Sequence, residues 1–201
     1  MLLSKSILLL LILLSGFNRP INKPYFKKWV ITNGSSLQVN GSTNINKFNC
    51  VIANYSRPDT LTFYHEDEAE TIKFTGLMVL DVQNFDCHNP MMTKNLRKTL
   101  KTKIHPKLFI KFISLNRYPD ENDHGREAIH GAVSIQLAGV TRFFNIHYNI
   151  ISAGTNSLTM VGNRRLKFSA FNLSPPKKIG NMIQAKDELD IIFHLNVKVL
   201  D

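Results

Sequence analysis

The sequence is poor in the features on which most enzymes and metalloproteins depend. Hydrolase, metalloprotease and nucleotide-binding signatures of the G-x-S-x-G, H-E-x-x-H, P-loop and G-x-G-x-x-G types are absent. The seven histidines are scattered singly, with no H-x-H and no pair four residues apart on a helix. We therefore expect no catalytic residues, no metal site and no cofactor, and we expect that the protein is not an enzyme.

Cysteine is also scarce, with only Cys50 and Cys87 among 201 residues. In an oxidising compartment, two cysteines favour one disulfide that closes a long loop. Two buried thiols are the alternative, because the sequence does not fix the distance between them.

Long apolar runs are missing except at the N-terminus. There Lys5 precedes an unbroken apolar stretch, residues 7–14, and the small residues Ser15 and Gly16. This pattern is typical of a secretory signal peptide, which we place at residues 1–16 with an uncertain cleavage point. The run is about half of the roughly 20 apolar residues that span a membrane. The sequence therefore favours a cleaved signal peptide over a permanent membrane anchor. We expect an exported protein, which would be secreted or, in a bacterium, periplasmic.

Acidic residues are few: 15, against 25 basic residues, and only one of the basic residues lies in the expected leader. Such a balance favours anionic partners. Since an exported protein rarely meets nucleic acid, we expect an anionic membrane surface or envelope component rather than nucleic acid. Simple solvation of the surface explains the charge equally well.

Alternation of apolar and polar residues with a period of two recurs through most of the chain. It is clearest from Leu189 to Val199, where every second residue is apolar. The hairpin-length links between such segments indicate about eight antiparallel strands, and so an all-β closed barrel or a sandwich. The expected strands are residues 37–39, 44–52, 60–65, 71–81, 107–115, 129–137, 144–150, 157–162 and 189–199.

One segment departs from this alternation. Between residues 89 and 103, Met92, Leu96 and Leu100 recur every four residues, which predicts an amphipathic helix whose other face is basic. Pro90 suits the first turn of such a helix. We expect the helix to pack over an open end of the barrel. A more specific hypothesis is that the helix is a mobile lid over the ligand.

Three groups of residues, in the same order along the chain, resemble the YceI-like family of exported lipid-binding proteins. The first is Trp29 with residues 36–39 and 41–50 (GSTNINKFNC). The second is residues 84–89 (NFDCHN) with Met92, Leu96, residues 98–101 and His105-Pro106. The third comprises Phe168, residues 171–173, Pro175-Pro176, Gly180 and residues 187–189.

This resemblance implies a lipocalin-like antiparallel barrel over residues 29–201, preceded by a lead-in at 17–28, with one helix across it. It also implies a tunnel for a polyisoprenoid chain, such as an isoprenoid quinone or a polyprenyl lipid, held for transport, storage or sequestration. The alternative function is a ligand-free structural or interaction barrel that binds anionic envelope components. The oligomeric state stays open, with a dimer as one option.

Alternation selects the residues that would face such a ligand, and each of them serves equally well as plain core. Lys98 and Lys101 on the basic face of the helix are candidate contacts for an anionic head group. The candidate lining residues are Phe48, Phe74, Met78, Leu108, Ile110, Phe112, Val133, Ile135, Ile146, Tyr148, Ile191, Phe193 and Leu195.

Overall fold

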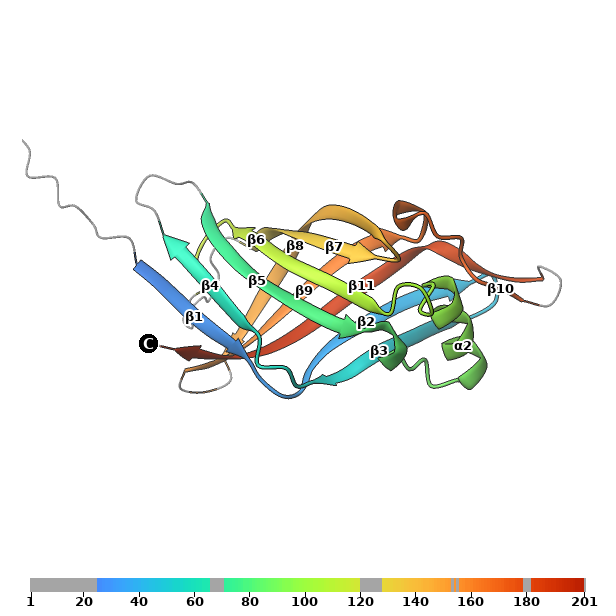
Figure 1. Cartoon of the computed structure of the whole chain (residues 1–201), viewed down its shortest axis with the longest axis horizontal. Coiled ribbons are helices and arrows are strands. Elements are labelled where there is room, and N and C mark those ends of the chain that lie inside the picture. Colours follow the sequence, from blue (N-terminus) through green and yellow to red (C-terminus); the bar gives the residue numbers. More distant parts are fainter. Residues whose placement is uncertain are drawn as a thin grey trace, which may run out of the picture.

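Antiparallel strands make up most of the computed structural model (Figure 1). The structure describes residues 25–65, 71–119, 128–152, 154, 156–178 and 182–200; the expected signal peptide lies outside these ranges. The helical segments there are η1 (Val82–Asn84), α2 (Pro90–Thr99) and η2 (Ser169–Phe171). The strands are β1 (Tyr25–Ile31), β2 (Ser35–Thr43), β3 (Lys47–Tyr55), β4 (Thr60–His65), β5 (Ile72–Asp81), β6 (Lys107–Leu115), β7 (Ile129–Leu137), β8 (Val140–Ser152), β9 (Ser157–Lys167), β10 (Lys177–Lys178) and β11 (Ile183–Leu200).

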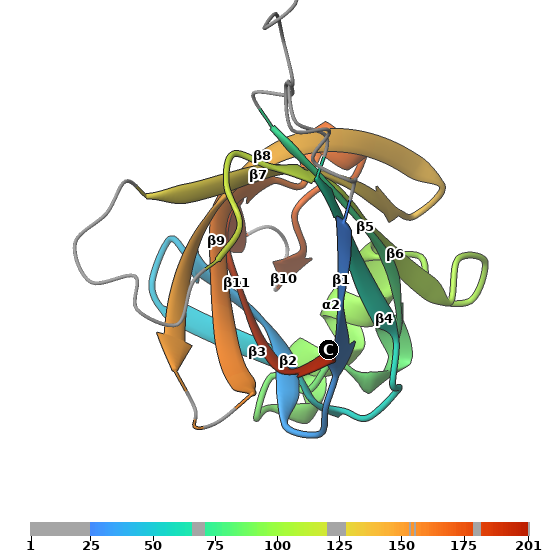
Figure 2. The same ribbon diagram turned by 90° about the vertical axis from the view of Figure 1, so that its left-hand side faces the viewer.

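The sheet closes on itself. Neighbouring strands follow the order β1-β4-β5-β6-β7-β8-β9-β11, and β11 pairs again with β1 to complete a ring of eight. Figure 2, the view turned by 90°, shows this ring of strands. The strands β2 and β3 extend the sheet beyond β11 at one end. The predicted all-β, eight-stranded antiparallel barrel is confirmed, and the sandwich alternative is excluded.

Period-two alternation places apolar side chains inside the barrel because successive residues of a strand point to opposite faces. In β11, five alternate residues from Leu189 to Val197 are buried, whereas the residues between them are at least partly exposed. The expected hairpin between β7 and β8 is present and turns through Ala138 and Gly139, which both have positive φ.

Several strand boundaries differ from the sequence-based expectation, and two of the differences have a clear physical reason. The strand β1 begins at Tyr25, inside the segment expected as a lead-in. The sequence does not predict this strand because the adjacent Lys27 and Lys28 interrupt the alternation. Residues 44–46, expected in a strand, form the turn between β2 and β3. The Thr43 hydroxyl accepts hydrogen bonds there from the backbone N–H groups of Ile45 and Asn46, which stabilises a turn rather than a strand.

The predicted helix is α2, at the end of the barrel where β2 and β3 extend (Figure 1). The Asn89 side chain caps it by accepting a hydrogen bond from Met92 N, and Pro90 lies in its first turn. The helix ends where Lys101 adopts a left-handed φ of 54° and Thr102 N donates to Arg97 O. It is shorter than the expected 89–103, since the residues after Leu100 form turns.

A disulfide joins Cys50 of β3 to Cys87, just before α2. Next to it, Val51 and Asp86 exchange two backbone hydrogen bonds of 2.7 and 2.9 Å. The expected disulfide is therefore present, and it fastens the segment that leads into α2 to the extended part of the sheet.

Candidate ligand cavity and its cap

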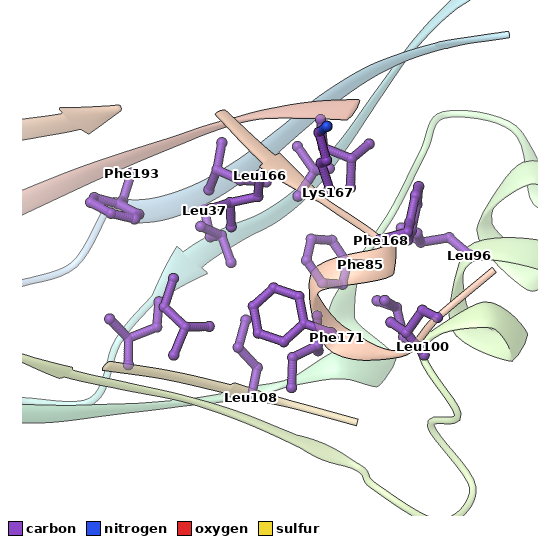
Figure 3. Close-up of a pocket in the computed structure, with 17 residues that line it drawn as sticks. Leu37, Phe85, Leu96, Leu100, Leu108, Leu166, Lys167, Phe168, Phe171 and Phe193 are labelled. Atoms are coloured by element: carbon purple, nitrogen blue, oxygen red, sulfur yellow. The ribbon is translucent and has the colours of Figure 1, made fainter. Parts of the chain in front are cut away.

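A small apolar cavity lies inside the barrel at the end covered by α2 (Figure 3). Its volume is about 60 Å³. Lys167 contributes its aliphatic stem, because its amine is directed to Glu188, 4.0 Å away. The walls come from strands β2, β6, β7, β9 and β11 and from the segments that cap the barrel: Leu37, Val39, Phe85, Leu96, Leu100, Leu108, Ile110, Ile135, Leu137, Leu166, Lys167, Phe168, Phe171, Leu173, Leu189, Ile191 and Phe193.

The outer end of the cavity is closed by side chains that do not belong to the barrel strands. Leu96 of α2, its C-cap residue Leu100 and Phe85 before the helix are buried here, together with Phe168 and Phe171 at η2. We refer to these five residues as the cap. The cap thus stands on short helical segments and their flanking residues rather than on the hydrogen-bonded strand ladder of the barrel.

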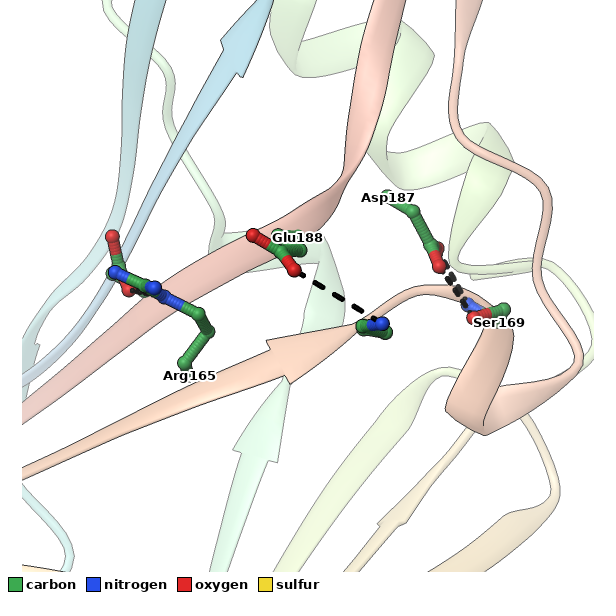
Figure 4. Close-up of polar contacts among 6 residues, drawn as sticks. Arg165, Ser169, Asp187 and Glu188 are labelled. Atoms are coloured by element: carbon green, nitrogen blue, oxygen red, sulfur yellow. Dashed lines mark hydrogen bonds and ion pairs between the residues drawn. The ribbon is translucent and has the colours of Figure 1, made fainter.

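The η2 part of the cap is fastened to the start of β11 (Figure 4). The Asp187 carboxylate accepts hydrogen bonds from the backbone N–H and the hydroxyl of Ser169. The Ser169 hydroxyl in particular holds the pKa of Asp187 below its ordinary value. Nearby, Arg165 pairs with Asp190 at 2.9 Å.

The other half of the barrel is filled by aromatic side chains. Phe63 lies between Trp29 and Phe74, with ring centroids 4.6 and 4.4 Å apart, and Phe74 continues to Phe112 at 4.9 Å. The Trp29 indole N–H donates to the Tyr118 hydroxyl at 3.0 Å. This end is packed like an ordinary core, whereas the apolar cavity lies at the capped end.

No known protein-family model matches the sequence, and no curated protein matches it. Solved structures do match. One is BcnA of Burkholderia cenocepacia, with a TM-score of 0.55 and 16% identity over 81% of this chain and 95% of that one. A polyisoprenoid binding domain from Saccharophagus degradans aligns with a TM-score of 0.53 and 9% identity, covering 86% of this chain and 98% of that one.

A third match is the YceI protein of Campylobacter jejuni, with a TM-score of 0.50 and 12% identity over 70% of this chain and 81% of that one. The chain has a YceI-like fold. The family resemblance of the sequence thus agrees with the architecture, and the YceI-like barrel carries its helix across one end as expected.

The expected lining residues divide into two sets within the YceI-like barrel. Of the thirteen, all but Phe48 are buried. Only some of them reach the cavity wall, and the others fill the barrel. Phe48 is partly buried against the core and lines a groove that it shares with Met92, outside the cavity. The five on the cavity wall are Leu108, Ile110, Ile135, Ile191 and Phe193.

Alternation missed the residues that cap the cavity. Phe85, Phe168 and Phe171 lie in short segments where no period reveals which side faces inward. The spacing of Leu96 and Leu100 predicts that they lie on the apolar stripe of the helix, and in the structure both face the cavity. The apolar stripe of the helix was thus the one sequence signal that pointed to the cap, because such a stripe has to be buried against another part of the protein.

Tyr148 is unusual among the buried residues of the YceI-like barrel. Its side chain packs beside Phe193, with the ring centroids 6.4 Å apart, and its hydroxyl has no hydrogen-bond partner within the described residues. Burial raises the pKa of this hydroxyl well above its ordinary value. An unpaired buried hydroxyl is costly, and it lies next to a residue of the cavity wall.

The outer face of α2 borders a basic groove. Lys98 and Lys101, the expected head-group contacts, line it and are exposed. Lys94, Arg97 and Lys103 complete the cationic set, whereas Asp86 is the one carboxylate among the described lining residues. The candidate head-group residues therefore lie on the far side of the same helix whose Leu96 and Leu100 close the cavity.

The described ranges offer neither a metal site nor a membrane-spanning helix. No cluster of three or more histidine, cysteine or carboxylate side chains there could hold a metal ion. Over the same residues, no helix has both the length and the apolar character needed to cross a bilayer.

Proposed function

We propose that this protein binds the apolar chain of a lipid, of the polyisoprenoid type, inside its barrel and carries, stores or sequesters it. One observation carries the proposal: a wholly apolar cavity is closed by a separate cap rather than by strands. The Saccharophagus degradans domain that shares the fold is described as polyisoprenoid binding, which supports this class of ligand. The role is binding rather than catalysis.

Binding of a long chain requires the cap and part of the core to move. The cavity of about 60 Å³ is smaller than the ~150 Å³ that holds a benzene molecule. Displacement of Leu96, Leu100 and Phe171 would open the barrel end toward solvent. The chain would then enter past the cap, with any anionic head group left near Lys98 and Lys101.

We further propose that the protein works outside the cytoplasm, in the periplasm or as a secreted protein. The Cys50–Cys87 disulfide supports this location because disulfides persist in oxidising compartments. Cell fractionation together with the mass of the mature chain tests it. Full-length protein confined to the cytoplasm would contradict the proposal.

A second candidate is a filled barrel that binds anionic envelope components through its basic surface and holds no internal ligand. The small cavity volume favours it. Mass spectrometry of an organic extract of the purified protein, followed by uptake of a fluorescent polyprenyl probe, separates the two functions. A stoichiometric long-chain lipid supports the carrier, whereas ligand-free protein that takes up no probe supports the filled barrel.

A matched pair of variants sharpens the uptake measurement. Ile135→Phe adds volume at the cavity wall, whereas Ile151→Phe makes the same change at an exposed position. We expect Ile135→Phe to take up less probe than the wild type, and Ile151→Phe to match it. Equal uptake by both variants, each shown to be folded by its melting temperature, would place the probe elsewhere on the protein.

A further inference from the structure

We infer that the capped end of the barrel, with the outer face of α2, is a docking surface for an anionic lipid bilayer. The inference deepens the proposed function, since it assigns a membrane partner to the same end of the protein that holds the cavity. It rests on three features that coincide there: unpaired lysines, exposed apolar side chains and the cap.

The lysines are free to meet an anionic partner. Lys94, Lys98, Lys101 and Lys103 are all exposed on or just after α2, and none of them forms an ion pair with a carboxylate within the described residues. Arg97 is different, because its Nη2 donates to the Phe85 carbonyl oxygen at 2.9 Å and fastens the helix to the preceding segment. The four lysines thus form a free cationic face.

Other basic residues of the molecule do have carboxylate partners. Lys107 pairs with Asp81 at 2.6 Å, and Arg165 pairs with Asp190 at 2.9 Å. The lysines at α2 are distinguished by their grouping along one groove rather than by the lack of a carboxylate partner alone.

Large apolar side chains surround this cationic face. Ile104 is 74% exposed, Met182 is 73% exposed, and Ile45 and Met91 are each 61% exposed. We call these four residues the apolar tips. They come from three different parts of the chain: the β2–β3 turn, α2 with the turns after it, and the start of β11.

Contacts and lining residues bring these tips to one end of the barrel. Asn44 Nδ2 donates to Met182 O at 2.8 Å, which joins the β2–β3 turn to the start of β11. Ile45 shares a groove with Met92 of α2, and Ile104 lines the basic groove with the lysines. Figure 1 shows α2, the β2–β3 turn and β10 together at this end.

Exposed apolar residues among lysines suit a lipid surface better than a soluble polyanion. Lysines are attracted to anionic head groups. The apolar tips, in contrast, favour binding only where they leave water for the boundary between the head groups and the acyl chains of a bilayer. A soluble anionic polymer would satisfy the lysines and leave the tips exposed. The bilayer is therefore the occupant that uses both features.

Docking in this orientation has a consequence for ligand entry. Leu96 and Leu100 line the cavity, and Lys94, Lys98 and Lys101 lie on the opposite side of the same helix. An α-helix with its side chains is about 10 Å across. A docked barrel would therefore hold its cavity one helix diameter from the lipid, and displacement of α2 would join the two.

Vesicle binding tests the inference with the purified full chain. Co-sedimentation is measured with phosphatidylcholine vesicles, with and without phosphatidylglycerol, at low and high salt. We expect binding to the anionic vesicles that weakens as salt rises. Since each lysine near an anionic surface strengthens binding about fivefold, Lys98→Glu with Lys101→Glu should weaken it at least about 25-fold.

A matched double variant controls for net charge. Lys111→Glu with Lys198→Glu makes the same charge change at exposed positions on β6 and β11, outside the docking surface, and should lose much less binding. Met91→Ser with Ile104→Ser should leave the salt-dependent part of the binding unchanged. It should lower the part of the binding that remains at high salt.

Three outcomes would overturn the inference. They are equal binding to neutral and anionic vesicles, equal losses in the two lysine double variants, and binding to a soluble polyanion without binding to vesicles. Extraction and probe uptake are measured without vesicles, so the proposed function can fail while docking holds, and docking can fail while the chain is still bound.

Discussion

Asp187 on β11 accepts two hydrogen bonds from Ser169 at the start of η2, one from the backbone N–H at 2.9 Å and one from the hydroxyl at 2.5 Å. This pair connects the last strand to the segment that places Phe171 in the cap. Because the Asp187 pKa is lowered in the fold, its charged form contributes stability at neutral pH. That contribution is lost as the pH falls from about 4 through the folded-state pKa.

The first prediction concerns this pair. In Ser169→Ala, the Asp187 pKa should rise toward its ordinary value, because the hydroxyl donor is the main cause of the lowering. Carbon-13 NMR titration of the carboxyl group measures it. The accompanying loss in free energy of unfolding should be at most about 1 kcal/mol, since the pair is exposed to solvent. An unchanged Asp187 titration in this variant would contradict the prediction.

The second prediction concerns the disulfide. Cys50 and Cys87 are separated by 37 positions, and closing a loop of that length stabilises the folded state by about 4 kcal/mol in the chain-entropy model. Cys50→Ser with Cys87→Ser should lower the free energy of unfolding by a similar amount, as measured by urea denaturation. Thiol counting of the wild type under denaturing, non-reducing conditions should find none, and two free thiols would refute the bond.

The third prediction concerns the unpaired hydroxyl of Tyr148. Tyr148→Phe removes a buried polar atom that has no partner within the described residues and keeps the ring, so the ligand-free protein should gain up to about 1 kcal/mol of stability. Ile146→Val, a change of buried side-chain volume on the same strand, should instead lose about 0.5–1.5 kcal/mol. Thermal unfolding compares them, and a clear loss of stability in Tyr148→Phe would show that the hydroxyl has a partner.

The fourth prediction ranks two glycines of the barrel. A Cβ atom at Gly131 would lie 2.1 Å from the backbone oxygen of Ser114, whereas one at Gly162 would meet the ring of Phe193 at 2.2 Å. A ring can shift toward the cavity, but a backbone oxygen in a strand cannot easily move. Gly162→Ala should therefore cost about 1–3 kcal/mol and Gly131→Ala more, both measured by denaturant unfolding.

A further consequence of Gly162→Ala connects stability with binding. A Phe193 ring pushed inward would occupy part of the cavity, so uptake of the polyprenyl probe should fall in this variant. The opposite ranking of the two unfolding costs, or unchanged uptake by a folded Gly162→Ala protein, would contradict this account.

The sequence predicts the barrel well because strand alternation is a local property. Every second residue from Leu189 to Val197 is apolar, and the structure buries these residues. The first strand is not predicted, because Lys27 and Lys28 are adjacent and break the period. Pairing with β4 and β11 keeps this segment extended, and such partners cannot be read from the segment itself.

The candidate site was less accessible from the sequence. Alternation shows which side of a strand faces inward but not how deep each residue lies along the barrel axis. Phe74 and Ile135 therefore look alike, although Phe74 lies in the filled half and Ile135 borders the cavity. The cap residue Phe171 lies in a three-residue helix, too short to show any periodicity.

The strand β11 pairs with β1, β2, β9 and β10, and it contains the last described residues of the chain. The ring is thus closed by a contact between β1 and β11, which are far apart along the chain. Closure has to wait until β11 has been synthesised, and contacts of such long sequence separation form slowly. Until then β1 and β9 present unpaired edges, so the incomplete chain is the form of this protein most exposed to aggregation.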